Sequence, residues 1–294
     1  MKQTQAPKRV CAIHDLSAFG RCALTVVIPT LSALGIQTVP LPTALMSTHT
    51  GGYEDIYIRD LTEDMRPMAA HWKKLGVTFD SIYSGFVLSP EQGHIIAEVI
   101  ESFRTSSTLV LVDPVMGDDG QLYSTCTEEL REVMLELCRM ADVITPNLTE
   151  ACMLTGTPYP REGFGCEAAA REAAARLLTS LSALCPRIAI TGIEYTEGEG
   201  CCVMTACADG GEMRFFSQPK VGVSYPGTGE LFASVLLGLM LGGRDFFGSA
   251  EFSGGFVADT ISCSHGVIEE TRHGTALETA LACLNSVNAP PRKT

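Results

Sequence analysis

The segment Gly227-Thr228-Gly229-Glu230 stands directly before residues 231–241, an apolar stretch with the length of a buried helix. Glycines let backbone N–H groups approach a phosphate closely, and the positive end of a helix dipole favours an anion there. A bound phosphate repels a neighbouring carboxylate, so a carboxylate at this position needs a functional explanation. Accepting a proton from an attacking hydroxyl is such a function. The segment therefore indicates an anion site with a base attached. An ordinary helix start, capped by Thr228 or Glu230, explains the same residues.

Outward from this helix, the preceding chain alternates short apolar strands with helices. The predicted strands are residues 9–13, 37–41, 81–84, 108–112, 143–145 and 187–191. The predicted helices are residues 23–34, 63–75, 91–103, 128–140 and 167–181. Parallel strands buried between crossover helices are the simplest packing for that order.

The rest of the chain completes one α/β domain over residues 1–294. Strands at 201–206 and 213–217 flank Asp209-Gly210-Gly211 as in a hairpin, and helices dominate from residue 231 onward. Residues 158–165 are expected to form a surface loop. The ends, residues 1–8 and 288–294, are expected to be frayed tails.

Composition narrows the class of protein. With 294 residues, of which 46% are hydrophobic, the chain can bury a large core, and no apolar run approaches membrane-spanning length. A formal charge of -13 argues against a nucleic-acid partner, which requires clustered Lys and Arg. The polar start does not resemble a signal peptide, so we expect a cytoplasmic protein without membrane contact. The twelve cysteines lie mostly in apolar runs and are expected to be reduced core thiols.

Polar residues that follow the strands are the next candidates, because ligands of open parallel sheets bind beyond the carboxyl ends of the strands. Strand 108–112 continues into Asp113-Pro114-Val115-Met116-Gly117-Asp118-Asp119-Gly120. Carboxylates that crowd together repel one another, so this loop suits Mg²⁺ or a flap over a phosphate. For Asp118 and Asp119, a polar turn without a ligand is an equal alternative.

Three further strand ends carry polar groups. Asn147 and Glu150 follow strand 143–145 with the spacing of a helix N-cap and its capping box, which needs no ligand. The same geometry could hold metal-bound water near phosphates. The first strand is followed by His14-Asp15-Leu16-Ser17 and the second by a loop with Ser47-Thr48-His49-Thr50-Gly51-Gly52. Either could bind a small polar substrate, although lone loop histidines are more often structural.

Four of these segments together resemble the ribokinase-like superfamily, and within it the vitamin B6 kinases. The motifs are His49-Thr50-Gly51-Gly52, Asp113-Pro114-Val115-Met116-Gly117-Asp118 with Tyr123 following, Ile144-Thr145-Pro146-Asn147-Leu148-Thr149-Glu150, and Gly227-Thr228-Gly229-Glu230. The longer forms Ser47-Thr48-His49-Thr50-Gly51-Gly52 and Tyr83-Ser84-Gly85-Phe86 are most similar to the pyridoxamine kinases. The resemblance implies a three-layer α/β sandwich with a mainly parallel central sheet.

The same resemblance implies transfer of the ATP γ-phosphate to the 5′-hydroxymethyl group of a B6 vitamer. It implies Mg²⁺, a monovalent cation such as K⁺, and a homodimer. Glu230 would be the catalytic base, and Gly227, Thr228 and Gly229 would form the anion hole. Residues that match nucleotide-binding positions are Asp113, Asn147, Glu150, Thr191 and Lys220, with Asp113 and Glu150 also facing the metal. Residues expected around the pyridine ring are Asp15, Ser17, Thr50 and Tyr83, with Asp118 and Tyr123 in a closing flap.

Two departures from the family pattern leave alternatives open. The family has Asp where this chain has Glu230, and the extra methylene moves the carboxylate by roughly 1 Å, which can cost about a hundredfold in rate. Asp15 also stands where pyridoxal kinases often have Ser, so the preferred vitamer stays open. A hydroxymethylpyrimidine or sugar kinase of the same fold is one alternative. A weakly active B6- or nucleotide-binding protein is the other.

Overall fold

A single nine-stranded sheet forms the centre of the molecule in the computed structural model, which describes residues 6–287. In spatial order the strands are β11 (Glu212–Pro219), β10 (Gly200–Asp209), β9 (Arg187–Glu197), β8 (Val143–Ile144), β5 (Leu109–Val112), β4 (Ser81–Ser84), β1 (Arg9–Phe19), β2 (Gln37–Thr48) and β3 (Ile58–Asp60). In this spatial order the pairs between β9 and β2 are parallel, and the antiparallel pairs are β9–β10 and β10–β11 at one end and β2–β3 at the other. The predicted mainly parallel sheet and the 201–217 hairpin are confirmed.

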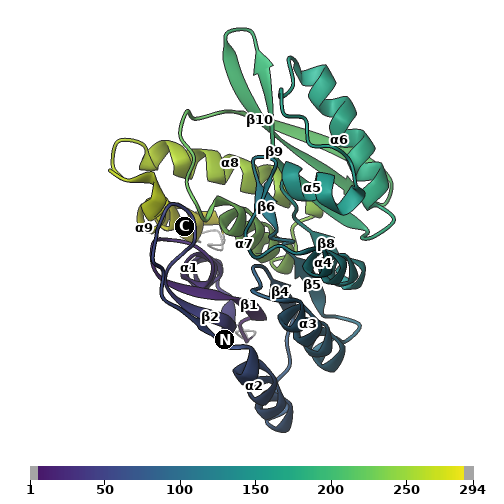
Figure 1. Cartoon of the computed structure of the whole chain (residues 1–294), viewed down its shortest axis with the longest axis vertical. Helices are drawn as coiled ribbons and strands as arrows, with labels where there is room; N and C mark the ends of the chain where they lie inside the picture. Colours follow the sequence, from purple (N-terminus) through teal and green to yellow (C-terminus); the bar gives the residue numbers. More distant parts are fainter. Residues whose placement is uncertain (1–5, 288–294) are drawn as a thin grey trace, which may run out of the picture.

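Helices cover both faces of this sheet. One core contains side chains from α2 (Thr62–Lys74), α3 (Pro90–Phe103), α4 (Glu128–Met140), α5 (Leu148–Thr155) and α6 (Glu167–Leu181). The other contains side chains from α1 (Leu24–Ala33), α7 (Thr228–Leu241), α8 (Phe246–Ser264) and α9 (Leu277–Val287). Figure 1 shows α3, α4 and α6 on the opposite side of the sheet from α1 and α9. The predicted three-layer α/β sandwich is therefore confirmed.

The alternation of strand side chains explains why both faces are apolar. In β1, Cys11 and Ile13 belong to the first core, whereas Val10 and Ala12 belong to the second. Successive side chains of a strand point to opposite faces, so a strand buried on both faces is a continuous apolar run. That is the pattern from which the strands were predicted.

The helix that follows β8 begins as its sequence predicts. The Asn147 side chain accepts a hydrogen bond from Glu150 N at 2.9 Å, and Glu150 Oε2 accepts one from Asn147 N at 2.8 Å. This reciprocal capping box satisfies two N–H groups that a helix start leaves without partners. It also fixes the buried Glu150 carboxylate close to the carboxyl end of β8.

Three local expectations were wrong. The predicted loops at 14–17 and 47–48 belong to strands, because β1 and β2 stay paired as far as Phe19 and Thr48. Lys8 is not frayed, since its Nζ pairs with Asp80 Oδ1 at 2.8 Å and its carbonyl accepts a hydrogen bond from Gln37 N. Residues 1–5 and 288–294 of the predicted tails lie outside the described residues.

Two other sequence expectations concern membrane spans and thiols. Of the helices within residues 6–287, none combines the length and apolar character needed to cross a membrane. The buried cysteines are free thiols: Cys11, Cys138, Cys152, Cys185 and Cys207. These five lie in the core as expected, whereas Cys166 and Cys263 are exposed and do not fit the expected core placement.

Candidate active site

The loop before α7 is held tightly against the loop before α1. Gly227 has a φ of 84°, in the left-handed region, and a Cβ built on it would lie 2.3 Å from Arg21 O. Only glycine fits this conformation and this contact. Thr228 Oγ1 donates a hydrogen bond to Tyr225 O at 3.1 Å. The first N–H groups of α7 therefore start from a fixed loop, as an anion site at a helix N-terminus requires.

Glu230 lies in the first turn of α7 and reaches across to the start of α1. Its Oε1 accepts a hydrogen bond from Ala23 N at 3.3 Å and lies 3.3 Å from Cys22 Sγ, which is placed to donate. Ala23 has a φ of 50°, an uncommon value for a residue other than glycine. The carboxylate thus sits between the N-terminal ends of two helices, where a negative charge is favoured.

Asp15 faces the same space from β1. Its side chain is 5% exposed, and its Oδ2 accepts a hydrogen bond from Ser17 Oγ at 2.8 Å. Burial raises the pKa of Asp15 to about 6, with a further increase from the charge of Glu230, while the Ser17 hydrogen bond opposes the shift. The structure thus brings Asp15, Ser17 and Glu230 together.

Asp113, at the end of β5, is buried beside two other carboxylates. Its Oδ1 accepts a hydrogen bond from Thr145 Oγ1 at 3.0 Å. Burial and the Glu230 charge raise the pKa of Asp113 to about 8. Glu150 Oε1 accepts a hydrogen bond from Met116 N at 3.1 Å, and burial together with Asp113 raises the pKa of Glu150 well above its usual value. Carboxylates crowded in this way favour a compensating cation.

The raised pKa of Asp113 predicts a pH dependence of folding. The native state keeps the proton up to pH of about 8, whereas the unfolded chain loses it near 3.8, so stability should fall as pH rises through this window. Asp113→Asn, which cannot ionise, should therefore raise the Tm of the metal-free protein at pH 8 by about 3 °C or more, and by much less at pH 5. Thermal unfolding in EDTA at both values is the measurement. An equal Tm difference at the two pH values would contradict the assignment.

A short hairpin covers this group of carboxylates. Its strands are β6 (Gly117–Asp118) and β7 (Gln121–Leu122), which pair antiparallel. Asn147 Nδ2 donates to Gly117 O at 2.8 Å, and Gly120 N donates to Thr149 Oγ1 at 2.9 Å. The hairpin is therefore tied to the start of α5. It carries Asp118 at the end of β6, in the segment that the sequence predicted as a flap.

Tyr123 follows the hairpin and keeps 39% of its surface exposed. Its backbone N–H donates to Met116 O at 3.0 Å. Partial burial, with Asp118, Glu150 and Glu230 nearby, raises the pKa of Tyr123 above its usual value. Tyr123 thus lies within the field of the same carboxylates and stays protonated at neutral pH.

Of the predicted nucleotide-side residues, Asn147 lines a neighbouring hollow. Asp118, Asn147, Tyr159, Gly192 and Glu194 are among the residues that line it. Thr191 pairs with Asn147 in a parallel bridge. Lys220 Nζ contacts Glu194 Oε2 at 2.6 Å, so an acidic side chain already engages this positive charge.

Tyr83, predicted beside the pyridine ring, lies near the candidate site, and burial, with Asp113 and Glu230 nearby, raises its pKa well above the usual value. The side chain is fully buried on β4, and its ring packs edge-on against His14 with 4.4 Å between the ring centres. It belongs to the core beneath α1 and α7, together with Ala12 and Leu111. Thr50, in contrast, is exposed on the loop after β2.

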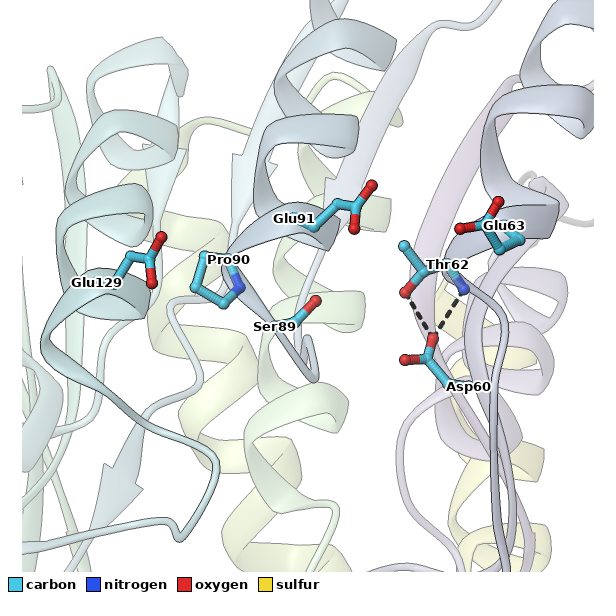
Figure 2. Close-up of a pocket in the computed structure, with 7 residues that line it drawn as sticks. All are labelled: Asp60, Thr62, Glu63, Ser89, Pro90, Glu91 and Glu129. Carbon is cyan, nitrogen blue, oxygen red and sulfur yellow. Dashed lines mark hydrogen bonds between the residues drawn. The ribbon is translucent and has the colours of Figure 1, made fainter.

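A separate acidic cleft lies at the starts of α2, α3 and α4. Asp60, Glu63, Glu91 and Glu129 line it, and Figure 2 shows Asp60 bonded to Thr62 at its edge. None of the sequence-predicted site residues lines this cleft. Its negative side chains would repel phosphates, so it is not a candidate nucleotide site.

Three residues next to Glu230 were missed by the sequence analysis: Arg21, Cys22 and Ala23. Gly20, with a φ of 86°, directly precedes them and was the only local signal of an unusual turn. Their role depends on contact with the loop before α7, some 200 positions further along the chain. A local pattern carries no information about such a contact.

A carboxylate at a helix start, beside glycines suited to phosphate and at the carboxyl edge of a mainly parallel sheet, is an arrangement that suits a small-molecule kinase. Comparison with known proteins leads to the same class. The chain belongs to the family described as phosphomethylpyrimidine kinase, whose model matches residues 27–275. Its fold is that of the ribokinase-like enzymes, as the resemblance in sequence implied.

Individual relatives agree with this assignment. A curated pyridoxine/pyridoxal/pyridoxamine kinase of Bordetella avium is 26% identical over 266 residues, which cover 87% of this chain and 85% of the relative. A Bacteroides thetaiotaomicron protein assigned to the phosphomethylpyrimidine kinases, crystallised with pyridoxal, is 36% identical over 98% of each chain, with a TM-score of 0.87. The pyridoxal kinase of Lactobacillus plantarum is 29% identical, covers 96% of this chain and 98% of its own, and has a TM-score of 0.84.

Proposed function

We propose that this protein transfers the γ-phosphoryl group of ATP to the 5′-hydroxymethyl group of a vitamin B6 vitamer. The observation that carries the proposal is the 36% identity, over 98% of both chains, to a protein that was crystallised with pyridoxal. The polar groups at the carboxyl edge of the sheet support it, since they combine a candidate base with a loop suited to phosphate. The family name keeps hydroxymethylpyrimidine as the alternative substrate to test.

In the proposed reaction, Glu230 accepts the proton of the vitamer hydroxyl while the hydroxyl oxygen attacks the γ-phosphorus. The bond between the γ-phosphorus and the bridging oxygen breaks, and ADP leaves with that electron pair. The amides of Gly227 to Gly229 and the dipole of α7 favour the phosphate charge. Asp15, Ser17 and Thr50 would orient the ring, and the β6–β7 hairpin would exclude water that competes with the hydroxyl.

Asp113 and Glu150 would hold a hydrated Mg²⁺, which neutralises phosphate charge when bound. Their buried, mutually repelling carboxyl groups fit such an ion. Within residues 6–287, no set of three or more His, Cys, Asp or Glu side chains is arranged to enclose a metal. The two carboxylates would therefore act together with water and the nucleotide. Asn147, Thr191 and Lys220 would contact the phosphates, with Asp118 and Tyr123 on the hairpin side. A monovalent cation such as K⁺ and a homodimer are also part of the proposal.

The proposal predicts one phosphorylated product. Purified protein with Mg·ATP and each of pyridoxal, pyridoxine, pyridoxamine and hydroxymethylpyrimidine should add one phosphate to the primary 5′-alcohol of at least one B6 vitamer, as identified by mass spectrometry. Excess EDTA should abolish turnover, because the carboxylates and the phosphates would then face each other uncompensated. Phosphorylation of hydroxymethylpyrimidine alone would overturn the substrate class. Full activity in EDTA would overturn the metal requirement.

A further inference from the structure

His49 connects the loop after β2 to a distant part of the chain. Its side chain is 5% exposed, and it directly precedes Thr50. Its Nδ1 accepts a hydrogen bond from Gly51 N at 3.1 Å, so in the neutral ring the proton lies on Nε2. Nε2 then donates to Arg272 O at 2.7 Å. One imidazole therefore shapes its own loop and fixes that loop to η1 (Thr271–His273).

Arg272 and Tyr53 reinforce the same junction. Arg272 Nη1 donates to Gly52 O at 3.2 Å, and the guanidinium lies 5.0 Å from the centre of the Tyr53 ring. Tyr53 Oη donates to Arg272 O at 3.3 Å. A Cβ on Gly20 would lie 2.7 Å from His49 Cδ2, so the imidazole is also packed against the loop before α1. The His49 ring is thus fixed on several sides.

The junction continues to the candidate anion loop. Arg21 N donates to His273 O at 3.1 Å, and a Cβ on Gly274 would lie 2.8 Å from Arg21 O. The same Arg21 O is the atom that a Cβ on Gly227 would meet at 2.3 Å. The η1 segment and Arg21 therefore form a continuous packed path from His49 to the loop before α7.

We propose that His49 is a positioning residue, whose bond to Arg272 O sets the distance between the Thr50 loop and the Gly227 loop. This inference rests on the proposed function, because it assigns the acceptor alcohol to the Thr50 side and phosphate to the Gly227 side. Loss of the bond lets the Thr50 loop sample other positions, so the acceptor binds less often in the reactive geometry. In the part of the chain that the structure describes, Asn147 is hydrogen-bonded to Gly117 and Glu150, away from this junction, so we expect the nucleotide side to stay unchanged.

Two isosteric replacements separate the two hydrogen bonds of the ring. In His49→Asn the side-chain oxygen can replace Nδ1 and accept from Gly51 N, but the side chain is too short to reach Arg272 O. In His49→Gln the amide nitrogen can replace Nε2 and donate to Arg272 O. We expect His49→Asn to raise the KM for pyridoxal about tenfold or more, the effect of one lost hydrogen bond, with the KM for ATP within twofold. His49→Gln should recover most of that loss.

A second measurement separates positioning from folding. Amide hydrogen exchange in residues 50–53 and 271–274 should be faster in His49→Asn than in His49→Gln, with the Tm values of the two variants within about 2 °C. The proposal would be overturned if His49→Asn and His49→Gln had equal KM values for pyridoxal. It would also be overturned if His49→Asn raised the KM for ATP as much as the KM for pyridoxal. If the wild-type protein phosphorylates only hydroxymethylpyrimidine, the proposed function fails, and the same comparison with that alcohol still tests His49.

Discussion

Replacing Glu230 with glutamine is expected to lower kcat by about 100- to 10,000-fold, the usual contribution of a general base. Dissociation constants for ATP and pyridoxal should stay within a few fold, because proton acceptance acts mainly in the transition state. Glutamine keeps the size of the side chain and an oxygen that can accept from Ala23 N, so the local structure should survive. The measurements are single-turnover phosphorylation for the chemical step and calorimetry for binding.

The matched control for this change is Glu251→Gln, which removes one negative charge from an exposed position on α8. Its kcat should equal that of the wild-type protein. If Glu230→Gln also keeps wild-type turnover, Glu230 is not the base, and the interpretation of the Gly227–Glu230 segment as a catalytic element is wrong. A matching rise in both dissociation constants would instead indicate a role in binding.

The sheet and its helices were predictable because their signals are local. Apolar runs such as 108–112 are buried on both faces by helices, and the spacing of Asn147 and Glu150 encodes a cap that forms within one turn. The ends of β1 and β2 were not predictable in this way. Polar residues such as His14 and Asp15 resemble loop residues, yet pairing between the two strands continues beyond them. The pairing of β1 depends on the sequence of β2 as well, so the residues of β1 alone do not show where the strand ends.

The candidate site shows the same division. Carboxylates at strand ends, such as Asp113, were predictable because parallel strands bring their carboxyl ends to one edge. The sequence did not predict on which face of the sheet the Tyr83 side chain lies. That face depends on the register of β4 with β1 and β5. The bond from His49 to Arg272 joins residues 223 positions apart, and Cys22 lies 208 positions from Glu230. Only the folded chain brings these pairs together.

Glu230→Asp is the second change for which we expect a large effect, and it acts in the opposite direction. The loop before α7 is pinned by the contact between Gly227 and Arg21 O, so the backbone has little room to adapt to a longer side chain. The carboxylate of Glu230 contacts Cys22 Sγ and Ala23 N, each at 3.3 Å. Aspartate, which the resemblance in sequence implies at this position, would draw it back by one methylene. We expect kcat to rise about tenfold or more, because an offset of roughly 1 Å can cost about a hundredfold.

A substitution at Cys22 distinguishes two explanations: either Cys22 holds the Glu230 carboxylate away from the reacting hydroxyl, or Cys22 helps to orient it for the reaction. If the contact with Cys22 holds the carboxylate away from the reacting hydroxyl, Cys22→Ala should raise kcat in the wild-type protein and have little effect in the Glu230→Asp variant. If the start of α1 has instead become part of the base's own site, Glu230→Asp should lower kcat, and Cys22→Ala should lower it as well. Coupling between the two substitutions, measured as a double-mutant cycle on kcat, reports the contact itself. A drop in kcat for Glu230→Asp would therefore mean that Cys22 and Ala23 orient the base in this protein, and that the longer side chain is matched to its site.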